Sequence, residues 1–212
     1  MGSENLDSAD NQQERLSSEE ARSWFIAGFV EGEGSVTVSI KRHGGNPFGL
    51  YIQPEFFVYQ HRARRELLEM AQEYFGAGLI RPKPGNPDVL VYSIMSRPVI
   101  RERVLPFLSD CGRFSARVAD YEKFAAVVRL LDAGLHRDPW GMSLIVEIAY
   151  SMNANGKQRR VPLADILGRI PRGHMPDALE PERRYGPTSV ATRRARRNSN
   201  DLALQLDIPA GE

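Results

Sequence analysis

The order of apolar and polar residues predicts a buried helix and then an alternating strand near the start of the chain. Ser17 and Glu20 have the spacing of a helix-capping box, and bulky apolar residues crowd positions 19–32, so we predict a mostly buried helix there. The segment SVTVSIK that follows alternates strictly. It predicts a strand with an apolar face, Val36, Val38 and Ile40, and a polar face, Ser35, Thr37, Ser39 and Lys41.

The remaining pattern predicts a second strand, another hairpin and several helices. A strand at 50–60 follows a glycine-rich loop, and a helix at 62–75 is expected to stop at Gly76. A second hairpin pairs 79–81 with 89–94 across a loop rich in proline and glycine. Later helices are predicted to begin at Ser96, Ser115 and Asp138 and just past Pro162. This order of helix, hairpin, helix, hairpin and helices indicates an α+β fold.

Composition favours one globular domain with an extension at each end. The chain has 212 residues, 42% hydrophobic and 26% charged, which is enough to bury a sizeable core. We predict an acidic, flexible tail over 1–17, a domain over 18–170 and a Pro/Arg-rich extension over 171–212. No apolar run approaches the roughly 18 residues of a membrane span, and the polar start is unlike a secretory signal. No membrane partner is therefore expected, and the expected location is intracellular, cytoplasmic or organellar.

Charge is distributed unevenly along the chain, although the net charge is only +1. Residues 1–20 carry six acids against Arg15, a net of −5, so the rest of the chain carries +6. The basic residues of that part cluster on predicted strands and loops, a pattern that suits a surface facing phosphates. Ordinary solvated charge gives the same count. The distribution by itself leaves both interpretations open.

The most informative motif is IAGFVEGEG at 26–34, where the predicted helix ends in two carboxylates between glycines. A helix C-terminus carries a partial negative charge, so carboxylates there are disfavoured by about 0.3 to 1 kcal/mol each. A divalent cation would reverse that sign, because a hard metal takes carboxylate, carbonyl and water oxygens as ligands. The alternative is a solvated helix end with a glycine stop. Two acids alone do not decide between these interpretations.

The nine residues together resemble the motif of the LAGLIDADG homing endonuclease family, and the likeness covers roughly 23–152. The resemblance implies a fold in which the hairpins form a curved antiparallel saddle, with additional helices at the C-terminal side. It also implies that Glu33 is the catalytic and metal-binding carboxylate, that the Gly32 carbonyl lies beside it, and that Glu31 has a more structural role. The expected cofactor is Mg²⁺, which Mn²⁺ or Ca²⁺ can replace for binding.

A single motif copy without an internal repeat implies a homodimer, because members of this family pair two motif helices side by side. Small residues on the helix permit that close approach. The expected contact residues are Trp24, Ala27, Gly28 and Glu31. The double-stranded DNA target is then expected to be long and pseudo-palindromic, in keeping with the symmetry of the protein.

The strands supply the expected DNA-binding residues, because a two-stranded ribbon can enter the major groove and present alternate side chains to base edges. Solvent exposure alone is the competing interpretation for each of them. The expected set is Ser35, Thr37, Ser39, Lys41, Tyr51, Gln53, Tyr59, Arg81 and Lys83. Glu55 and Phe57 lie on the same face of the second strand, and Phe57 interrupts its polarity.

The resemblance also implies catalytic helpers at Gln60, Arg64 and Arg117. In PEFFVYQHRARRELL a glutamine ends the strand and an arginine opens the next helix, as in the family stretch that organises water and phosphate. Arg64 as a plain helix-surface charge is the alternative. A basic residue, often lysine, normally precedes the later long helix. Ser115 and Ala116 stand there instead, so only Arg113 or Arg117 can substitute.

Together these features predict a site-specific DNA endonuclease that hydrolyses phosphodiesters and promotes intron mobility. The stretch FGLYIQPEFFVYQH resembles members that target large ribosomal RNA genes. The alternative is a noncatalytic nucleic-acid binder of the same fold, either an RNA maturase or a DNA-binding regulator. The departure at Ser115 and Ala116 favours that alternative, and the intact Glu31 and Glu33 count against it.

Overall fold

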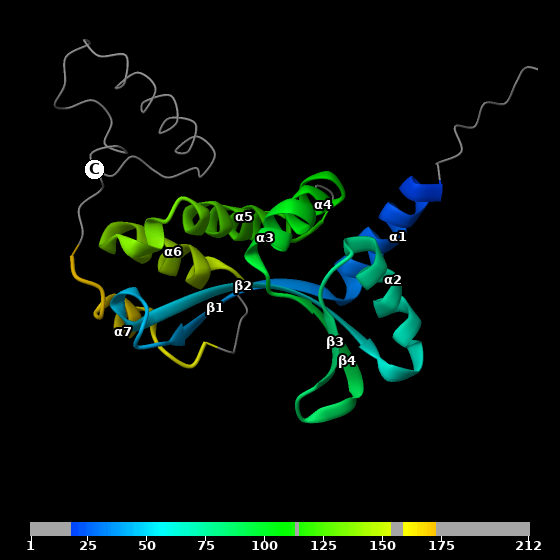
Figure 1. Cartoon of the computed structure of the whole chain (residues 1–212), viewed down its shortest axis with the longest axis horizontal. Coiled ribbons are helices and arrows are strands. Elements are labelled where there is room, and N and C mark those ends of the chain that lie inside the picture. Colours follow the sequence, from blue (N-terminus) through cyan, green and yellow to red (C-terminus); the bar gives the residue numbers. More distant parts are fainter. Residues whose placement is uncertain (1–17, 113–114, 154–158, 173–212) are drawn as a thin grey trace, which may run out of the picture.

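The protein is described by a computed structural model that covers residues 18–112, 115–153 and 159–172. The predicted acidic tail at 1–17 lies outside the described residues, as do Arg113 and all but the first two residues of the predicted extension at 171–212. Between those limits the elements alternate in the predicted order of helix, hairpin, helix, hairpin and helices (Figure 1). The predicted α+β fold is confirmed.

The first helix, α1 (Ser18–Glu33), passes directly into the first strand, β1 (Gly34–Arg42). Gly34 makes this tight exit possible, because a Cβ atom there would lie 2.6 Å from the Val30 carbonyl oxygen. The predicted alternation of β1 is confirmed: Val36 and Val38 are buried against the helices, and the intervening residues are half-exposed.

One four-stranded antiparallel sheet contains both hairpins, with β2 (Leu50–His61) and β4 (Asn86–Ile94) at its centre. The edges are β1 and the short strand β3 (Leu79–Lys83). The second hairpin is longer than the sequence predicts. Pro82 continues β3 because an edge strand tolerates a residue without an N–H, and the ladder shifts register between Pro82 and Lys83.

The helix between the hairpins, α2 (Arg65–Phe75), ends at Gly76 in the predicted left-handed conformation, with φ of 59°. It begins three residues later than predicted, after a 3₁₀ turn over Arg62–Arg64 that His61 caps through its ring nitrogen.

The C-terminal helices agree with the predictions in position and differ in detail. The segment predicted to start at Ser96 contains α3 (Arg97–Val99), a π-helical turn (Ile100–Val104) and α4 (Leu105–Asp110), and Ser96 makes no side-chain cap. The next helices are α5 (Val118–Asp132), α6 (Pro139–Ser151) and α7 (Leu163–Leu167). Asp138 caps α6 as predicted, by accepting hydrogen bonds from the N–H groups of Trp140 and Gly141.

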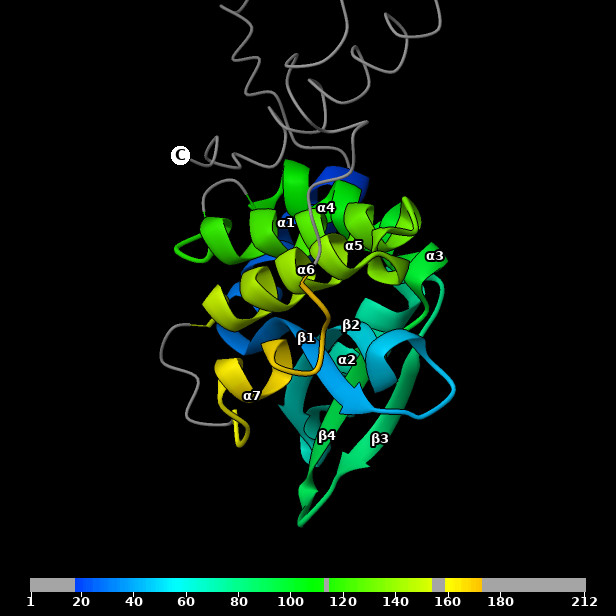
Figure 2. The same cartoon turned by 90° about the vertical axis from the view of Figure 1, so that its left-hand side faces the viewer.

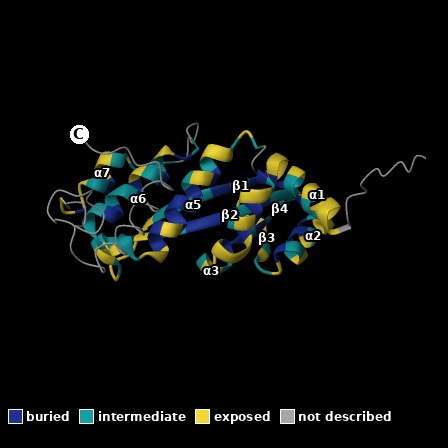
Figure 3. Cartoon of the chain, turned by 90° about the horizontal axis from the view of Figure 1, so that it is seen from above, coloured by how far each residue is buried: buried dark blue, intermediate teal, exposed yellow. Residues whose placement is uncertain are grey.

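The helices lie on one face of the sheet and leave its other face open. In Figures 1 and 2, α5 and α6 run above β1 and β2, while the β3–β4 hairpin descends on one side and α7 lies beside β1. Seen from above, the buried parts of β1 and β2 lie under α5 (Figure 3). The core between the layers includes an aromatic cluster in which the Phe75 ring lies 5.2 Å from Phe56 and 5.1 Å from Phe107.

None of the helices in the described ranges combines the length and apolarity that crossing a membrane would require.

Candidate functional site

The two carboxylates at the end of α1 have different surroundings. Glu31 is tied to the segment before α5: Ser115 Oγ donates to Glu31 Oε2 at 2.5 Å, and Arg117 Nη2 lies 3.6 Å from the same oxygen. Glu33, two residues on, is exposed and has neither a hydrogen bond nor an ion pair with any described residue. Glu31 is therefore held within the chain, and the Glu33 carboxylate is available to something outside it.

Arg117 caps the C-terminus of α1. Its Nη1 donates to the Gly34 carbonyl at 2.5 Å and its Nη2 to the Val30 carbonyl at 2.9 Å, with a further bond to the Glu31 carbonyl. A guanidinium at this end of a helix opposes the negative end of its dipole. Arg117 therefore offsets part of the negative charge at this helix end from within the chain. The sequence alone suggested that an external cation does so.

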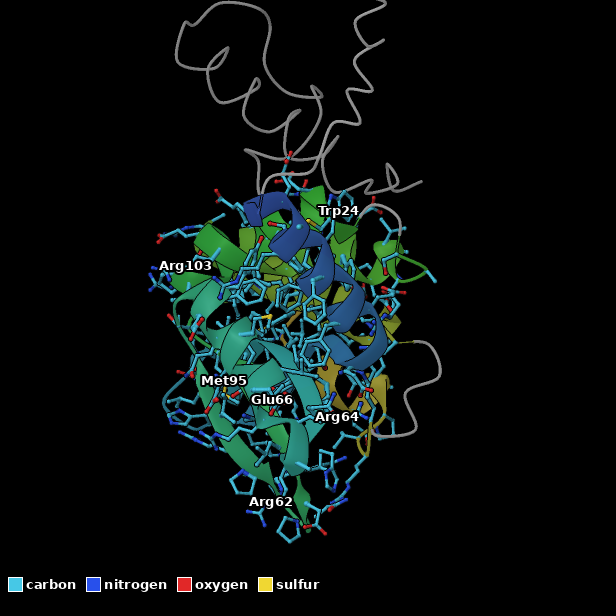
Figure 4. All side chains as sticks on the ribbon, turned by 90° about the vertical axis from the view of Figure 1, so that its right-hand side faces the viewer. Trp24, Arg62, Arg64, Glu66, Met95 and Arg103 are labelled. Carbon is cyan, nitrogen blue, oxygen red and sulfur yellow. The ribbon has the colours of Figure 1, made fainter. Side chains whose placement is uncertain are left out.

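Gln60 and Arg64 follow the point where β2 passes the end of α1. Val58 pairs with Gly34, the first residue after that helix, so Gln60 lies just beyond it along β2. The Gln60 side chain accepts a hydrogen bond from the His61 N–H at 2.8 Å. Arg64 is exposed at the start of α2. Figure 4 shows Arg62 and Arg64 at the lower end of the molecule, away from Trp24.

The exposed face of α1 lines a groove with the α4–α5 region. Its volume is about 240 Å³, and all four predicted interface residues line it: Trp24, Ala27, Gly28 and Glu31. Trp24 is 41% exposed, which is unusual for so large an apolar side chain. A Cβ atom added at Gly28 would meet no atom within 4 Å. Packing within the chain therefore gives no reason for glycine at this helical position.

The open face of the sheet carries the predicted DNA-binding residues in one ladder. The register opposes Ser35 to Phe57, Thr37 to Glu55, Ser39 to Gln53 and Lys41 to Tyr51. Tyr59, Val91 and Arg81 lie in register across three strands, which puts Arg81 on the same face. The register shift after Pro82 removes the simple alternation expected for Lys83, yet its Nζ still lies 5.1 Å from the centre of the Tyr59 ring.

A carboxylate at the centre of this face was not chosen from the sequence. Glu55 is only 6% exposed; its Oε2 accepts from Ser39 Oγ at 2.8 Å and its Oε1 from Lys41 Nζ at 3.4 Å. Lys41 Nζ also donates to Gln53 Oε1 at 3.1 Å. Burial, and secondly the charge of Glu55, raise the pKa of Tyr59. The alternating pattern predicted that Glu55 lies on this face. Its contacts with Ser39 and Lys41 become visible only in the folded chain.

The segment that leads into α7 forms one wall beside the open face. Tyr150 donates through its hydroxyl to the Val161 carbonyl at 2.7 Å, and the Arg159 guanidinium lies 4.3 Å from the Tyr150 ring centre. The groove between this wall and the sheet has a volume of about 920 Å³, and its lining reaches from Arg160 across Lys41 and Glu55 to Lys83. The sheet therefore has a channel along its open face that is lined by both polar and apolar side chains.

Potential metal ligands are few within one chain. Among the described residues, no three or more histidine, cysteine, aspartate or glutamate side chains lie close enough to hold an ion together. Glu33 and the Gly32 carbonyl at the exposed end of α1 offer oxygen ligands without competition from a described neighbour. This set suits a cation that keeps most of its water or takes ligands from another molecule.

Comparison with known proteins gives one consistent family. The LAGLIDADG endonuclease profile matches residues 26–128. The chain is 38% identical over 117 residues to DNA endonuclease I-CeuI of Chlamydomonas moewusii, a match that covers 54% of this chain and 54% of that enzyme. It therefore spans about half the length of that relative.

Solved structures agree with this assignment. The group I intron-encoded homing endonuclease I-CeuI in complex with DNA has a TM-score of 0.68 and 29% identity, covering 74% of this chain and 79% of the other. The archaeal intron-encoded homing endonuclease I-Vdi141I, also in complex with DNA, has a TM-score of 0.67 and 28% identity, covering 72% and 96%.

Proposed function

Because the chain belongs to the LAGLIDADG endonuclease family, we propose that it is a site-specific endonuclease that cleaves double-stranded DNA by metal-dependent phosphodiester hydrolysis. The observation that carries this proposal is that the two acids at the end of α1 have different partners. Arg117 and Ser115 engage Glu31 and the last helix carbonyls, while the Glu33 carboxylate stays exposed without a described partner. An exposed acid at a helix C-terminus would be stabilised by an external cation.

Glu33 and the Gly32 carbonyl are the groups that would hold the cation, with Mg²⁺ as the physiological ion and Mn²⁺ or Ca²⁺ able to bind in its place. When bound, the metal would activate water and stabilise the leaving oxygen of the phosphodiester. Gln60 and Arg64 orient water and phosphate beside it. Arg117 acts as a positioning residue, because its guanidinium is occupied by the carbonyls of α1.

We propose that the active form is a homodimer whose α1 helices pack against each other. Glycine in a helix costs roughly 0.5 to 1 kcal/mol relative to alanine, and nothing within the chain takes up the space at Gly28. The exposed Trp24 and the groove beside it supply apolar surface for the same contact. Two copies would bring two Glu33 carboxylates to one duplex.

The open face of the sheet is the proposed DNA-binding surface. Strands that alternate between a buried and a polar face suit entry into the major groove, and Lys41, Arg81 and Lys83 supply the donors on this face. The duplex target is expected to be long and pseudo-palindromic. We further propose that cleavage serves intron mobility, with large ribosomal RNA genes as the first targets to try.

Cleavage of a pool of duplexes provides the test. The full chain is incubated with Mg²⁺ and DNA that covers large ribosomal RNA genes and random genomic fragments, and the cut ends are sequenced. We expect discrete double-strand cuts, and Glu33→Gln should slow them by about 1000-fold or more while binding persists. Glu147→Gln, the same charge change on the exposed side of α6, serves as the matched control and should cut normally. Cleavage by Glu33→Gln at the wild-type rate would contradict the proposal.

A noncatalytic nucleic-acid binder of the same fold is the second candidate. One observation favours it: Arg117, the described residue expected to replace the basic residue before the later long helix, is bound to helix carbonyls. Such a binder would retard DNA or a folded intron RNA in a gel without cutting DNA at any Mg²⁺ concentration. The exposed Glu33 weighs against it, because a binder gains nothing from a free acid near phosphates.

A further inference from the structure

Glu55 is the one buried charged residue in the described part of the chain, and it lies on the face that we propose to contact DNA. A carboxylate there opposes binding in two ways. Its burial carries a desolvation cost, and its charge repels the phosphates of a duplex in the channel. Because Glu55 carries both a desolvation cost and a repulsion from phosphate at the centre of the binding surface, we expect it to have a function that offsets them.

The contacts of Glu55 indicate what that function is. Its two oxygens accept from Ser39 and Lys41, and Lys41 is further held by Gln53. The Lys41 ammonium is thereby drawn back along the ladder toward the middle of the sheet, although its side chain is still 54% exposed. Because the Ser39 hydroxyl gives its proton to Glu55, its oxygen is left as an acceptor.

We propose, resting on the DNA-binding function proposed above, that Glu55 is a positioning residue for sequence specificity. It holds Lys41 as a donor toward a guanine edge and Ser39 as an acceptor toward an adjacent amino group. A lysine is a flexible point charge that would otherwise extend to the nearest phosphate. Glu55 therefore lowers the affinity for duplexes of any sequence and raises the discrimination at one or two adjacent base pairs in each half-site.

The test is a binding selection from a pool of random-sequence duplexes, with wild type and Glu55→Gln compared position by position. The glutamine keeps the size of the side chain and one of the two acceptor oxygens, and it loses the charge that holds Lys41. We expect the preference at one or two adjacent positions to fall about 10-fold or more while the other positions keep theirs. Affinity for random duplex should rise, and the salt dependence of log K should steepen by about 0.9 per chain as Lys41 gains a phosphate contact.

Two further variants separate specificity from folding. Lys41→Met should lose the preference at the position that Lys41 reads, without the gain in random affinity. In the Glu55→Gln/Lys41→Met double variant the steeper salt dependence should disappear. Glu147→Gln, with the same charge change on the helical side, should leave every positional preference intact.

The inference is overturned if Glu55→Gln keeps all preferences, or loses them evenly at every position together with thermal stability, since an even loss indicates a purely structural role. A wild-type chain that selects no sequence at all would instead overturn the proposed function, and this inference with it.

Discussion

Two helices of this protein end against an arginine from a distant segment, and they end differently. At α2, Arg103 Nη1 donates to the Phe75 carbonyl at 2.6 Å, and Gly76 closes the helix in the left-handed conformation. At α1, Arg117 contacts several carbonyls, and the chain continues directly into β1. The last turn of α2 carries one acid, Glu73, whose carboxylate pairs with Arg22 at 3.0 Å, whereas the last turn of α1 carries two, Glu31 and Glu33.

We propose that this difference separates a helix end with a structural role only from one that forms the metal site. At the end of α2 the only acid of the last turn, Glu73, is paired with Arg22, and Gly76 and Arg103 close the helix. The end of α1 combines the negative end of the helix dipole with two carboxylates. Arg117 offsets part of this charge, and the Glu33 carboxylate has no partner among the described residues. This combination supports the proposal that Glu33 binds a metal ion.

Separate removal of the two arginines should have the largest effects at these helix ends. Arg117→Met and Arg103→Met each remove hydrogen bonds to a charged donor, so each should lower the free energy of unfolding by about 1.5 to 3 kcal/mol. Only Arg117→Met should also slow cleavage per folded molecule, by about 10-fold or more, because the end of α1 positions Glu33. Denaturant unfolding and single-turnover cleavage measure the two effects. Equal loss of cleavage in both variants would mean that both arginines contribute only to the stability of the fold.

The glycines at the two ends should respond similarly in stability, for different reasons. Gly34→Ala forces a Cβ atom against the Val30 carbonyl, and Gly76→Ala strains a left-handed residue beside Arg103. We expect each to cost about 1 to 3 kcal/mol in thermal unfolding. Gly28→Ala is the matched control within α1: it should leave the fold intact and weaken only self-association in sedimentation. Unchanged association of Gly28→Ala would remove the support that this glycine gives to the dimer.

A third helix end, that of α5, should show a smaller and pH-dependent effect. His136 lies just beyond it, and burial, followed by the charges of Arg97 and Arg137, lowers its pKa below the ordinary value of 6.5. The unfolded chain therefore binds a proton more readily, so His136 should reduce stability as the pH falls below 6.5 and have no effect well above it. In thermal unfolding, the His136→Gln variant should lose less stability than the wild type when the pH falls from neutral to mildly acidic. An identical pH profile in both would exclude this contribution.

The sequence predicted the elements where local pattern determines them. Strict alternation located β1, and Gly76 and Asp138 marked a helix end and a helix start. The second hairpin was predicted too short, because prolines near 82–87 suggest a loop. The position of β3 at the sheet edge explains why that strand tolerates Pro82. The break of the segment after Ser96 into α3, a π turn and α4 has no signal in local spacing.

The candidate site could be predicted only in part. Glu33 followed from the motif, and its assignment stays a prediction. The contacts of Ser115 and Arg117 with the end of α1 span more than 80 residues of sequence, so no local pattern reveals them. Glu55 was visible as a member of the polar face, but its burial depends on side chains from both strands of the hairpin.

The most direct test of the account is a metal titration of the protein–DNA complex, using Ca²⁺ and isothermal calorimetry on the duplex recovered by cleavage. Glu33→Gln should weaken Ca²⁺ binding by about 10-fold or more, whereas Glu31→Gln should bind Ca²⁺ nearly as the wild type does and lose only stability. Equal metal affinity in wild type and Glu33→Gln, or a larger loss in Glu31→Gln, would contradict the claim that Glu33 is the free carboxylate reserved for the metal.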